Sequence, residues 1–165
     1  MEIQIRAYQT EDTQAILDIL NYNILHSTSL YDYDLRSYEQ QKALLEEKII
    51  KGFPVIVAEI DGKTIGFGMY GEFRFKVAYQ YTVEHSVYVN ESFHDKGIGK
   101  LLLQELINIA RKQKIHTMIA VIDSENQNSV HFHEKFGFET TGVLKECGFK
   151  FDRWLHTVFM QLILK

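Results

Sequence analysis

The chain has 165 residues, of which 45% are hydrophobic and 24% charged, and its formal net charge is -4 at pH 7. This size and composition are those of one ordinary globular domain, which we expect to span residues 1–165. A negative net charge with scattered basic residues disfavours nucleic acid or an anionic membrane as a partner.

Cysteine content and hydropathy indicate the compartment. The single cysteine, Cys147, excludes an internal disulfide and a cysteine-based metal cluster, and it favours a reducing, cytoplasmic location. The first residues contain no apolar signal-peptide core, and no stretch approaches the roughly 18 apolar residues of a membrane span. We therefore expect neither a signal peptide nor a transmembrane helix.

The first half of the chain predicts two helices and four strands. Alternating apolar residues predict a short strand at residues 3–5, and Thr13 precedes an apolar series typical of a helix of about three to four turns. After a polar loop at residues 26–35, Ser37 is the predicted N-cap of a second helix that ends near Gly52. Strands follow at residues 55–60, 64–70 and 82–89, with a hairpin at Asp61-Gly62 and a loop at residues 72–81. Glycines at positions 66 and 68 predict a bulge or a close backbone approach.

The second half predicts two helices alternating with strands. A helix begins after Gly97, and its predicted core side carries Leu101, Leu102, Leu106, Ile109 and Ala110. A strand at 117–122, a short helix at 129–136 closed by Gly137, and strands at 139–147 and 155–164 follow. We expect a loop with Lys150, Asp152, Arg153 and Trp154 between the last two strands. This order predicts an α/β (α+β) fold with a mixed sheet, parallel across the Gly97 helix and antiparallel at the hairpin.

Two glycines mark the start of the third helix. A Walker phosphate loop would need a glycine where His94 stands and Ser or Thr where Leu101 stands, and a dinucleotide fingerprint would need a small residue at Leu102. Both motifs are rejected. A tight turn without a ligand stays an alternative, but free backbone amides between Lys96 and Lys100 form a suitable anion site.

These motifs resemble those of a known superfamily. Residues 94–99, HDKGIG, resemble the Q/R-x-x-G-x-G/A acetyl-CoA motif of the GNAT N-acetyltransferases, and residues 126–138, NQNSVHFHEKFGF, are similar to the signature that follows it. Residues 78–89 and 148–154 resemble the phosphinothricin N-acetyltransferase branch. The resemblance covers nearly the whole chain and implies a mostly antiparallel central sheet flanked by helices, with a β-α-β acetyl-CoA site.

The resemblance also implies a cofactor site. A strand that splays from its neighbour would offer backbone groups to the pantetheine arm and the thioester carbonyl, the glycine turn would wrap the pyrophosphate, and Asn126 would contact the pantetheine. The cofactor-binding residues implied in this way are Val87, Tyr88, Val89, Asp95, Lys96, Gly97, Ile98, Gly99, Lys100, Asn126 and Ser129.

Two residues are the catalytic candidates. Glu84 is an acidic residue inside an apolar and aromatic strand, and a carboxylate that is partly buried beside Tyr79 and Tyr81 could accept the proton of an attacking amine. The alternative is an exposed glutamate on the strand surface. His133 occupies the position at which many GNAT enzymes have a tyrosine that protonates the leaving thiolate, although a histidine on a short helix can instead be structural. The other histidines show no metal-site spacing, so no metal is expected.

The predicted acceptor is a small amino-acid-like amine of the phosphinothricin or methionine sulfoximine type. Arg74 and Lys76 could clamp its carboxylate, with Tyr79 and Tyr81 beside them, or they could be solvated surface charges. In the resembling branch a homodimer completes the pocket, near Lys150 and Trp154. Leu155 and His156 depart from that branch's pattern and leave the particular substrate open. Acetylation of a protein N-terminus or ribosomal protein, and a non-catalytic acyl-CoA sensor, remain alternatives.

Overall fold

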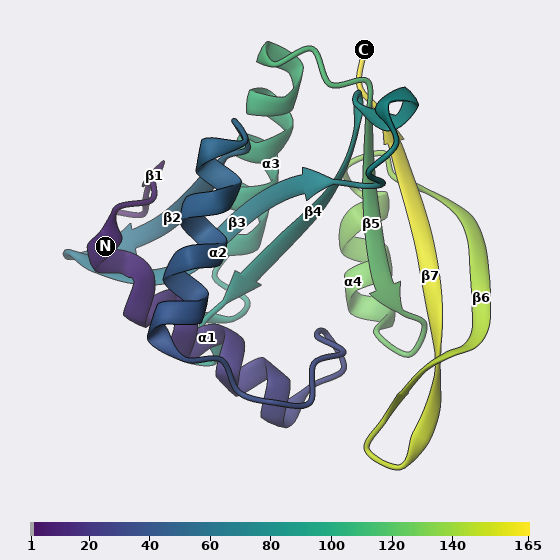
Figure 1. Cartoon of the computed structure of the whole chain (residues 1–165), viewed down its shortest axis with the longest axis horizontal. Coiled ribbons are helices and arrows are strands. Elements are labelled where there is room, and N and C mark those ends of the chain that lie inside the picture. Colours follow the sequence, from purple (N-terminus) through teal and green to yellow (C-terminus); the bar gives the residue numbers. More distant parts are fainter. Residues whose placement is uncertain (1) are drawn as a thin grey trace.

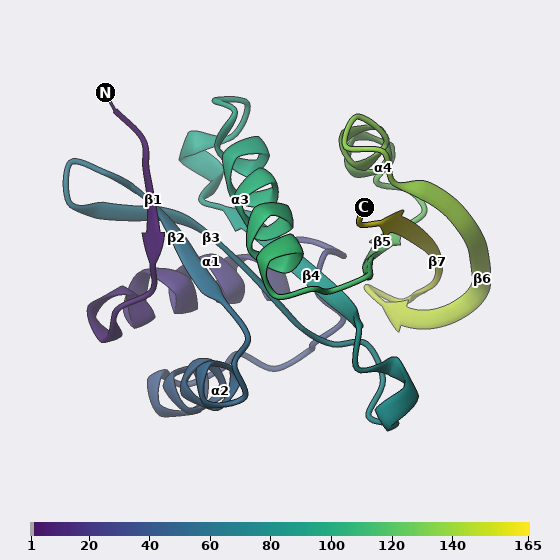
Figure 2. The ribbon, with the colours of Figure 1, turned by 90° about the horizontal axis from the view of Figure 1, so that it is seen from above.

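A seven-stranded sheet separates two pairs of helices in the computed structural model, which describes residues 2–165 (Figures 1 and 2). The strand order is β1-β2-β3-β4-β5-β7-β6, and every neighbouring pair is antiparallel except β4 and β5. The strands are β1 Gln4–Ala7, β2 Val55–Ile60, β3 Lys63–Glu72, β4 Thr82–Val89, β5 Thr117–Asp123, β6 Glu139–Lys150 and β7 Arg153–Ile163. The helices are α1 Thr13–His26, α2 Tyr38–Ile50, α3 Ile98–Lys112 and α4 Gln127–Glu134. The predicted fold class and element order are confirmed.

Local chemistry explains why these elements begin and end where they do. The Ser37 hydroxyl accepts the Gln40 amide at 3.2 Å and so caps α2. Asp61 and Gly62 have φ angles of 49° and 76°, the left-handed geometry that a two-residue hairpin requires. The predicted hairpin between β2 and β3 is therefore confirmed.

Gly66 and Gly68 of β3 allow α3 to approach the sheet closely. A Cβ at Gly66 would lie 3.0 Å from the Tyr88 carbonyl oxygen, and one at Gly68 would lie 3.1 Å from Leu106. The register of β2 with β3 also shifts between Ala58 and Glu59, next to Gly66. Both features expected from glycine in a strand, a close approach and a bulge, therefore occur here.

Two sequence predictions were wrong in detail. Leu101 is 42% exposed because it lies off the stripe of α3 that faces the sheet, and the buried residues of that stripe are Ile98, Leu102, Leu103, Leu106, Ile107 and Ala110. The predicted loop between the last strands is only a two-residue turn, Phe151-Asp152, in which both residues have positive φ. Lys150, Arg153 and Trp154 therefore belong to strands β6 and β7.

Each face of the sheet has its own apolar core. α3 and α4 cover one face, where Leu103, Leu106 and Met118 are buried, and α1 and α2 cover the other, where Leu20, Leu45 and Phe67 pack together (Figure 2). None of the helices in residues 2–165 is long and apolar enough to cross a membrane.

The parallel pair in the middle of the sheet comes apart along its length. β4 pairs with β5 only from Thr82 to Glu84, opposite residues 117–119, and the two strands then diverge (Figure 1). From His85 onward the edge of β4 that faces β5 is therefore released from the ladder. This divergence opens the sheet exactly where the sequence places its catalytic and cofactor candidates.

Candidate active site

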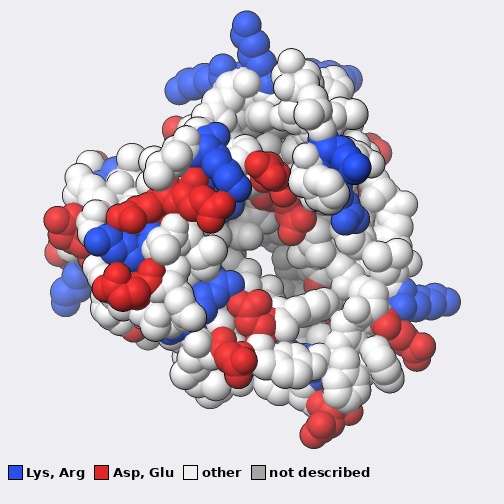
Figure 3. Space-filling model, in the orientation of Figure 1, with Lys and Arg blue, Asp and Glu red and all other residues white. Residues whose placement is uncertain are grey.

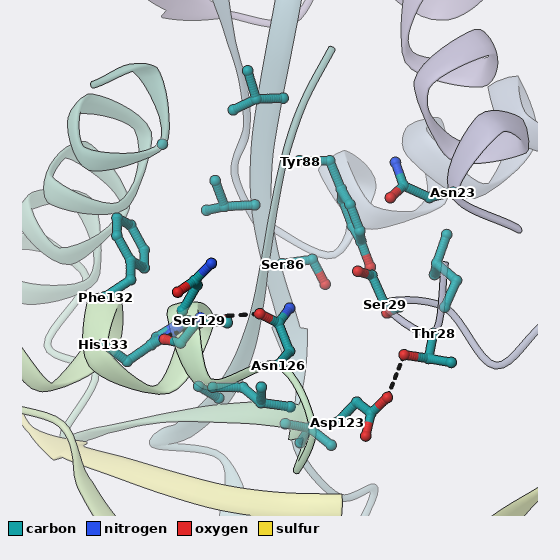
Figure 4. Close-up of a pocket in the computed structure, with 18 of the residues that line it drawn as sticks. Asn23, Thr28, Ser29, Ser86, Tyr88, Asp123, Asn126, Ser129, Phe132 and His133 are labelled. Atoms are coloured by element: carbon teal, nitrogen blue, oxygen red, sulfur yellow. Dashed lines mark hydrogen bonds between the residues drawn. The ribbon is translucent and has the colours of Figure 1, made fainter. Parts of the chain in front are cut away.

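A cavity of about 540 Å³ fills the gap between β4 and β5. Its lining comes from both diverging strands, the loop after α1, the turn before α3, and the first turns of α4 (Figure 4). The molecule is hollowed near the centre of the face in Figure 3, with acidic and basic side chains both close to the opening. Of the predicted site residues, the cavity is lined by Glu84, Val87, Tyr88, Val89, Asp95, Gly99, Asn126, Ser129 and His133.

Strand alternation divides β4 between two sides of the sheet. Glu84 and Tyr88 face the side of α1, whereas Val87 faces α3. On the α1 side the Tyr88 ring stacks on the Phe67 ring, with 5.5 Å between the ring centroids. Tyr88 donates its hydroxyl to the Ser29 carbonyl at 3.3 Å, and burial raises its pKa to about 12. The cavity therefore has an α3 side and an α1 side, joined through the split in the sheet.

Glu84 is a half-buried carboxylate in this cavity. Burial raises the pKa of Glu84 above its ordinary value, while the positive charges of Arg74 and Lys48 act in the opposite direction. Tyr79 and Tyr81, which were expected to bury it, are 44% and 56% exposed. The burial of Glu84 therefore arises from the walls of the cleft.

The start of α3 presents backbone amides without a side-chain cap. Gly97 is the N-cap with φ 77°, and Asp95 also has a left-handed φ, 62°. The side chain of Ile98 is only 1% exposed, so this residue can offer a ligand its backbone but not its side chain. Lys96 lies 4.7 Å from the Phe93 ring centroid, close to these amides. The turn thus has the open donors and positive charge of an anion site.

Asn126 caps α4 at the edge of the cavity. Its side-chain oxygen accepts the Ser129 amide at 3.1 Å (Figure 4), which occupies one end of the carboxamide. The amino end of this side chain has no such role in the cap, and both residues line the cavity. Asn126 can therefore cap the helix and donate to a ligand at once.

His133 forms a buried pair with His85. Their Nε2 atoms lie 3.0 Å apart, and His133 Nδ1 donates to the Ser129 carbonyl at 2.7 Å, so His85 Nε2 donates to His133 Nε2. Burial lowers the pKa of His133, and burial with the neighbouring ring lowers that of His85 to about 3. Both imidazoles are therefore neutral at pH 7. These contacts argue against His133 as the acid, because its one proton is already donated to a backbone carbonyl.

The loop after α1 forms the wall of the cavity on the α1 side. Tyr31 bonds Thr157 at 2.8 Å between hydroxyl oxygens, and the Thr28 hydroxyl donates to the buried carboxylate of Asp123 (Figure 4). Sequence analysis missed Thr28, Asp123 and Thr157, since these residues are separated along the chain and belong to no motif.

Lys150 anchors the same loop from strand β6. Its ammonium donates to the carbonyls of Ser27 at 2.8 Å and Leu30 at 2.7 Å, and the residue is only 4% exposed. Burial lowers the pKa of Lys150. Lys150 therefore fixes the loop after α1 against strand β6, and its ammonium is bonded to backbone carbonyls of that loop and not directed at a substrate.

The four predicted substrate-binding residues lie outside the cavity lining, in the loop between β3 and β4. Arg74 lies 5.2 Å from the Phe73 ring centroid. Its positive charge opposes the rise in the pKa of Glu84. Lys76 lies over the exposed ring of Phe75. The positive charge of Arg74 therefore lowers the pKa of Glu84, whereas Lys76 has no such effect.

The whole arrangement matches a known family. Residues 5–159 match the family model described as the acetyltransferase (GNAT) domain. The chain belongs to the GNAT acetyltransferase family. A curated GNAT relative, the L-methionine sulfoximine/L-methionine sulfone acetyltransferase of Salmonella typhimurium, is 38% identical over 160 residues, which are 97% of this chain and 94% of that protein.

Solved GNAT structures have the same fold. A phosphinothricin acetyltransferase from Sinorhizobium meliloti in complex with AcCoA has a TM-score of 0.96 and 33% identity, over 99% of this chain and 89% of that one. A structure from Brucella melitensis described as ribosomal-protein-alanine N-acetyltransferase also has a TM-score of 0.96, with 40% identity over 98% of this chain and 99% of that one. This chain is accordingly an N-acetyltransferase.

GNAT acetyltransferases use acetyl-CoA, and the cleft has features that fit it. The uncapped amides at Gly97 suit a pyrophosphate. The released edge of β4 offers donors and acceptors to an extended amide-containing arm. Gly99 lines the α3 side of the cleft, and a Cβ there would make an ordinary contact with Phe132 at 3.8 Å, so a larger side chain would extend into the cleft.

Proposed function

We propose that this enzyme transfers the acetyl group of acetyl-CoA to the amine of a small amino acid of the methionine sulfoximine or phosphinothricin type. The observation that carries the proposal is a half-buried carboxylate, Glu84, with cationic groups nearby, in a cleft that has an open helix N-terminus. The relatives named as L-methionine sulfoximine/L-methionine sulfone acetyltransferase and phosphinothricin acetyltransferase support this acceptor class.

Glu84 is the proposed general base. An amino acid at neutral pH carries an ammonium group, which cannot attack a carbonyl carbon until it loses a proton. The carboxylate of Glu84 accepts that proton, directly or through one water, and its raised pKa suits this role. The nitrogen would then form the new amide bond as the carbon–sulfur bond breaks. CoA would leave as a thiolate, which takes up the second proton that the nitrogen loses.

Backbone groups are the proposed cofactor contacts. When bound, acetyl-CoA supplies an activated acetyl thioester. The amides of residues 97–100 would hold the pyrophosphate, with Asp95 and Lys96 at the turn, and the free edge of Val87, Tyr88 and Val89 would orient the thioester carbonyl. Asn126 and Ser129 would contact the pantetheine arm at the start of α4.

We also propose that the enzyme is a cytoplasmic homodimer. The β6–β7 hairpin supports a dimer, because Phe149, Phe151 and Trp154 are exposed at its tip and β6 is an edge strand. The single cysteine, Cys147, is consistent with a reducing compartment.

Replacement of Glu84 tests the proposed reaction. The Glu84→Gln enzyme should release CoA from acetyl-CoA and L-methionine sulfone about 10²-fold more slowly than wild type, because a glutamine cannot accept the proton. Acetyl-CoA binding, measured by calorimetry, should be unchanged. Turnover that survives at the wild-type rate at pH 7 would show that Glu84 is not the base.

The same thiol-release assay separates the alternatives. The name of the Brucella melitensis structure favours a second candidate, an acceptor that is the N-terminal alanine of a ribosomal protein. Peptides with an N-terminal alanine should be poor acceptors if the proposal is correct. Tight acetyl-CoA binding without turnover on any amine would indicate a sensor.

A further inference from the structure

Lys48 of α2 places a cation next to Glu84, a position that no sequence motif indicated. The ammonium nitrogen of Lys48 occupies the space where Gly71 lacks a side chain, 2.5 Å from the position that a Cβ would take. Gly71 pairs directly with Glu84 in the register of β3 and β4. Directly opposed residues of an antiparallel pair point to the same face, with Cβ atoms about 4.5–5.5 Å apart. The Lys48 ammonium therefore lies beside the Glu84 side chain.

This ammonium is poorly satisfied within the protein. Within residues 2–165, the hydrogen bond recorded for it is a long one, 3.4 Å to the Tyr70 carbonyl. Burial lowers the pKa of Lys48, because removing the ammonium from water makes its charged form less stable. By contrast, the neighbouring Lys51 is paired with Glu47 at 2.9 Å on the helix surface. A partly buried ammonium with spare donors suits a ligand with acceptor oxygens.

Lys48 and Arg74 together surround the base with positive charge. They are the two cations whose charges oppose the rise in the pKa of Glu84. The carboxylate of an amino-acid acceptor, placed near Glu84, would be repelled by it unless a cation neutralised that carboxylate. Two cations next to the base provide that neutralisation.

Glu84 and Lys48 line two different cavities. Glu84 lines the large cleft, and Lys48 and Gly71 line a second cavity of about 300 Å³ between α2 and β3. Since Gly71 and Glu84 are register partners, the two cavities are lined by directly opposed residues of β3 and β4.

We propose that Lys48, with Arg74, binds the carboxylate of the amino-acid acceptor beside the Gly71–Glu84 register pair and so selects amino acids over simple amines. This inference rests on the proposed function and assigns to Lys48 the second cationic position that sequence analysis gave to Lys76. Gly71 is required for it, because any side chain there would displace the ammonium.

The test compares two acceptors that differ at the carboxyl group, which is charged in one and neutral in the other. Wild-type enzyme and a Lys48→Met variant are assayed with L-methionine sulfone and with its neutral carboxamide. The variant should raise KM for the amino acid about tenfold or more, as expected for one lost charge-assisted hydrogen bond. The kcat/KM for the carboxamide and the KM for acetyl-CoA should change by less than about threefold, and Lys48→Arg should retain most of the selectivity.

Lys42→Met is the matched control, because Lys42 lies on the same helix and pairs with Glu46 at 3.8 Å. The Lys42→Met variant should have wild-type KM and kcat/KM values for both acceptors. An equal loss of kcat/KM on both acceptors would overturn the proposal and show that Lys48 acts through Glu84 or the fold. Wild-type enzyme that acetylates neither compound would instead contradict the proposed function.

Discussion

At the residue scale, Glu84 combines the requirements of catalysis with a cost to stability. Its pKa is raised in the folded protein because the cleft walls exclude water. In the unfolded chain the same group titrates near 4.5, so the folded state holds the proton more tightly. Ionised Glu84 therefore lowers the free energy of unfolding. This loss of stability is absent below pH 4.5 and grows as the pH rises through the folded-state pKa.

We expect Glu84→Gln to be more stable than wild type at pH 7, although it is far less active. A neutral glutamine in the same place avoids the burial of a charge. The gain should appear as a higher urea midpoint at pH 7 and should vanish at pH 4. Glu72→Gln is the control, since Glu72 is an exposed residue nearby on β3. Equal midpoints for Glu84→Gln and wild type at pH 7 would contradict this expectation.

The histidine pair shows where sequence analysis reached its limit. The motif at residues 126–138 located His133 correctly at the cleft. Nothing in the motif indicates that His85, 48 residues away along the chain, donates to the His133 ring. His85 Nδ1 is buried without a partner among residues 2–165, so this pair is a polar network that the protein keeps neutral.

At the element scale, the parts of the site that depend on local sequence were predictable. The Gly97 turn and the strand that carries Glu84 each follow from neighbouring residues, and their positions agree with the structure. The helix predicted at residues 129–136 instead begins at Gln127, where Asn126 caps it. The loop after α1 did not follow in this way. Its place over the cleft depends on Lys150 and Thr157, which lie more than 100 residues further along the chain.

Lys150 gives a prediction for this loop. Lys150→Met removes two charge-assisted hydrogen bonds and leaves the carbonyls of Ser27 and Leu30 without their partner. Because the loop forms the wall on the α1 side, KM for the acceptor should rise about tenfold while KM for acetyl-CoA stays within about twofold. Steady-state kinetics with each substrate varied in turn measures both values.

Two further variants control this experiment. Lys145→Met removes an exposed lysine from the same strand and should have no effect. Gly148→Ala should resemble Lys150→Met, because a Cβ there would lie 2.5 Å from the Tyr31 ring. A Lys150→Met enzyme with equal increases in both KM values would show that β6 supports the whole cleft and not the loop alone.

At the scale of the whole molecule, a short parallel ladder between β4 and β5 joins the two halves of the sheet. β1–β4 form one part and β5–β7 the other, and the parallel ladder between them comprises three register pairs (Figure 1). The sequence predicted one parallel crossover but could not show where pairing stops, because divergence depends on how α3 and α4 pack against the two parts. A ligand in the cleft contacts both parts and should bind only the folded state.

Acetyl-CoA should therefore stabilise the enzyme strongly. At a hundredfold excess over Kd, a ligand that binds only the folded state adds about 2.7 kcal/mol. For a chain of this size that corresponds to a rise in Tm of roughly 5–10 °C, measured by differential scanning fluorimetry. Glu84→Gln should show the same rise, because the base lies apart from the pyrophosphate turn.

Gly99→Leu tests whether this stabilisation arises at the start of α3. The glycine lines the cleft opposite Phe132, so a leucine side chain there would occupy the space that the cofactor needs. The variant should keep a Tm of its own close to that of the free wild-type enzyme and lose most of the rise with acetyl-CoA. A full rise in Gly99→Leu would place the cofactor elsewhere, and a wild-type Tm that acetyl-CoA does not move would show that the cleft is not its site. The two results together decide whether the split in the sheet is what makes this fold an acetyl-CoA enzyme.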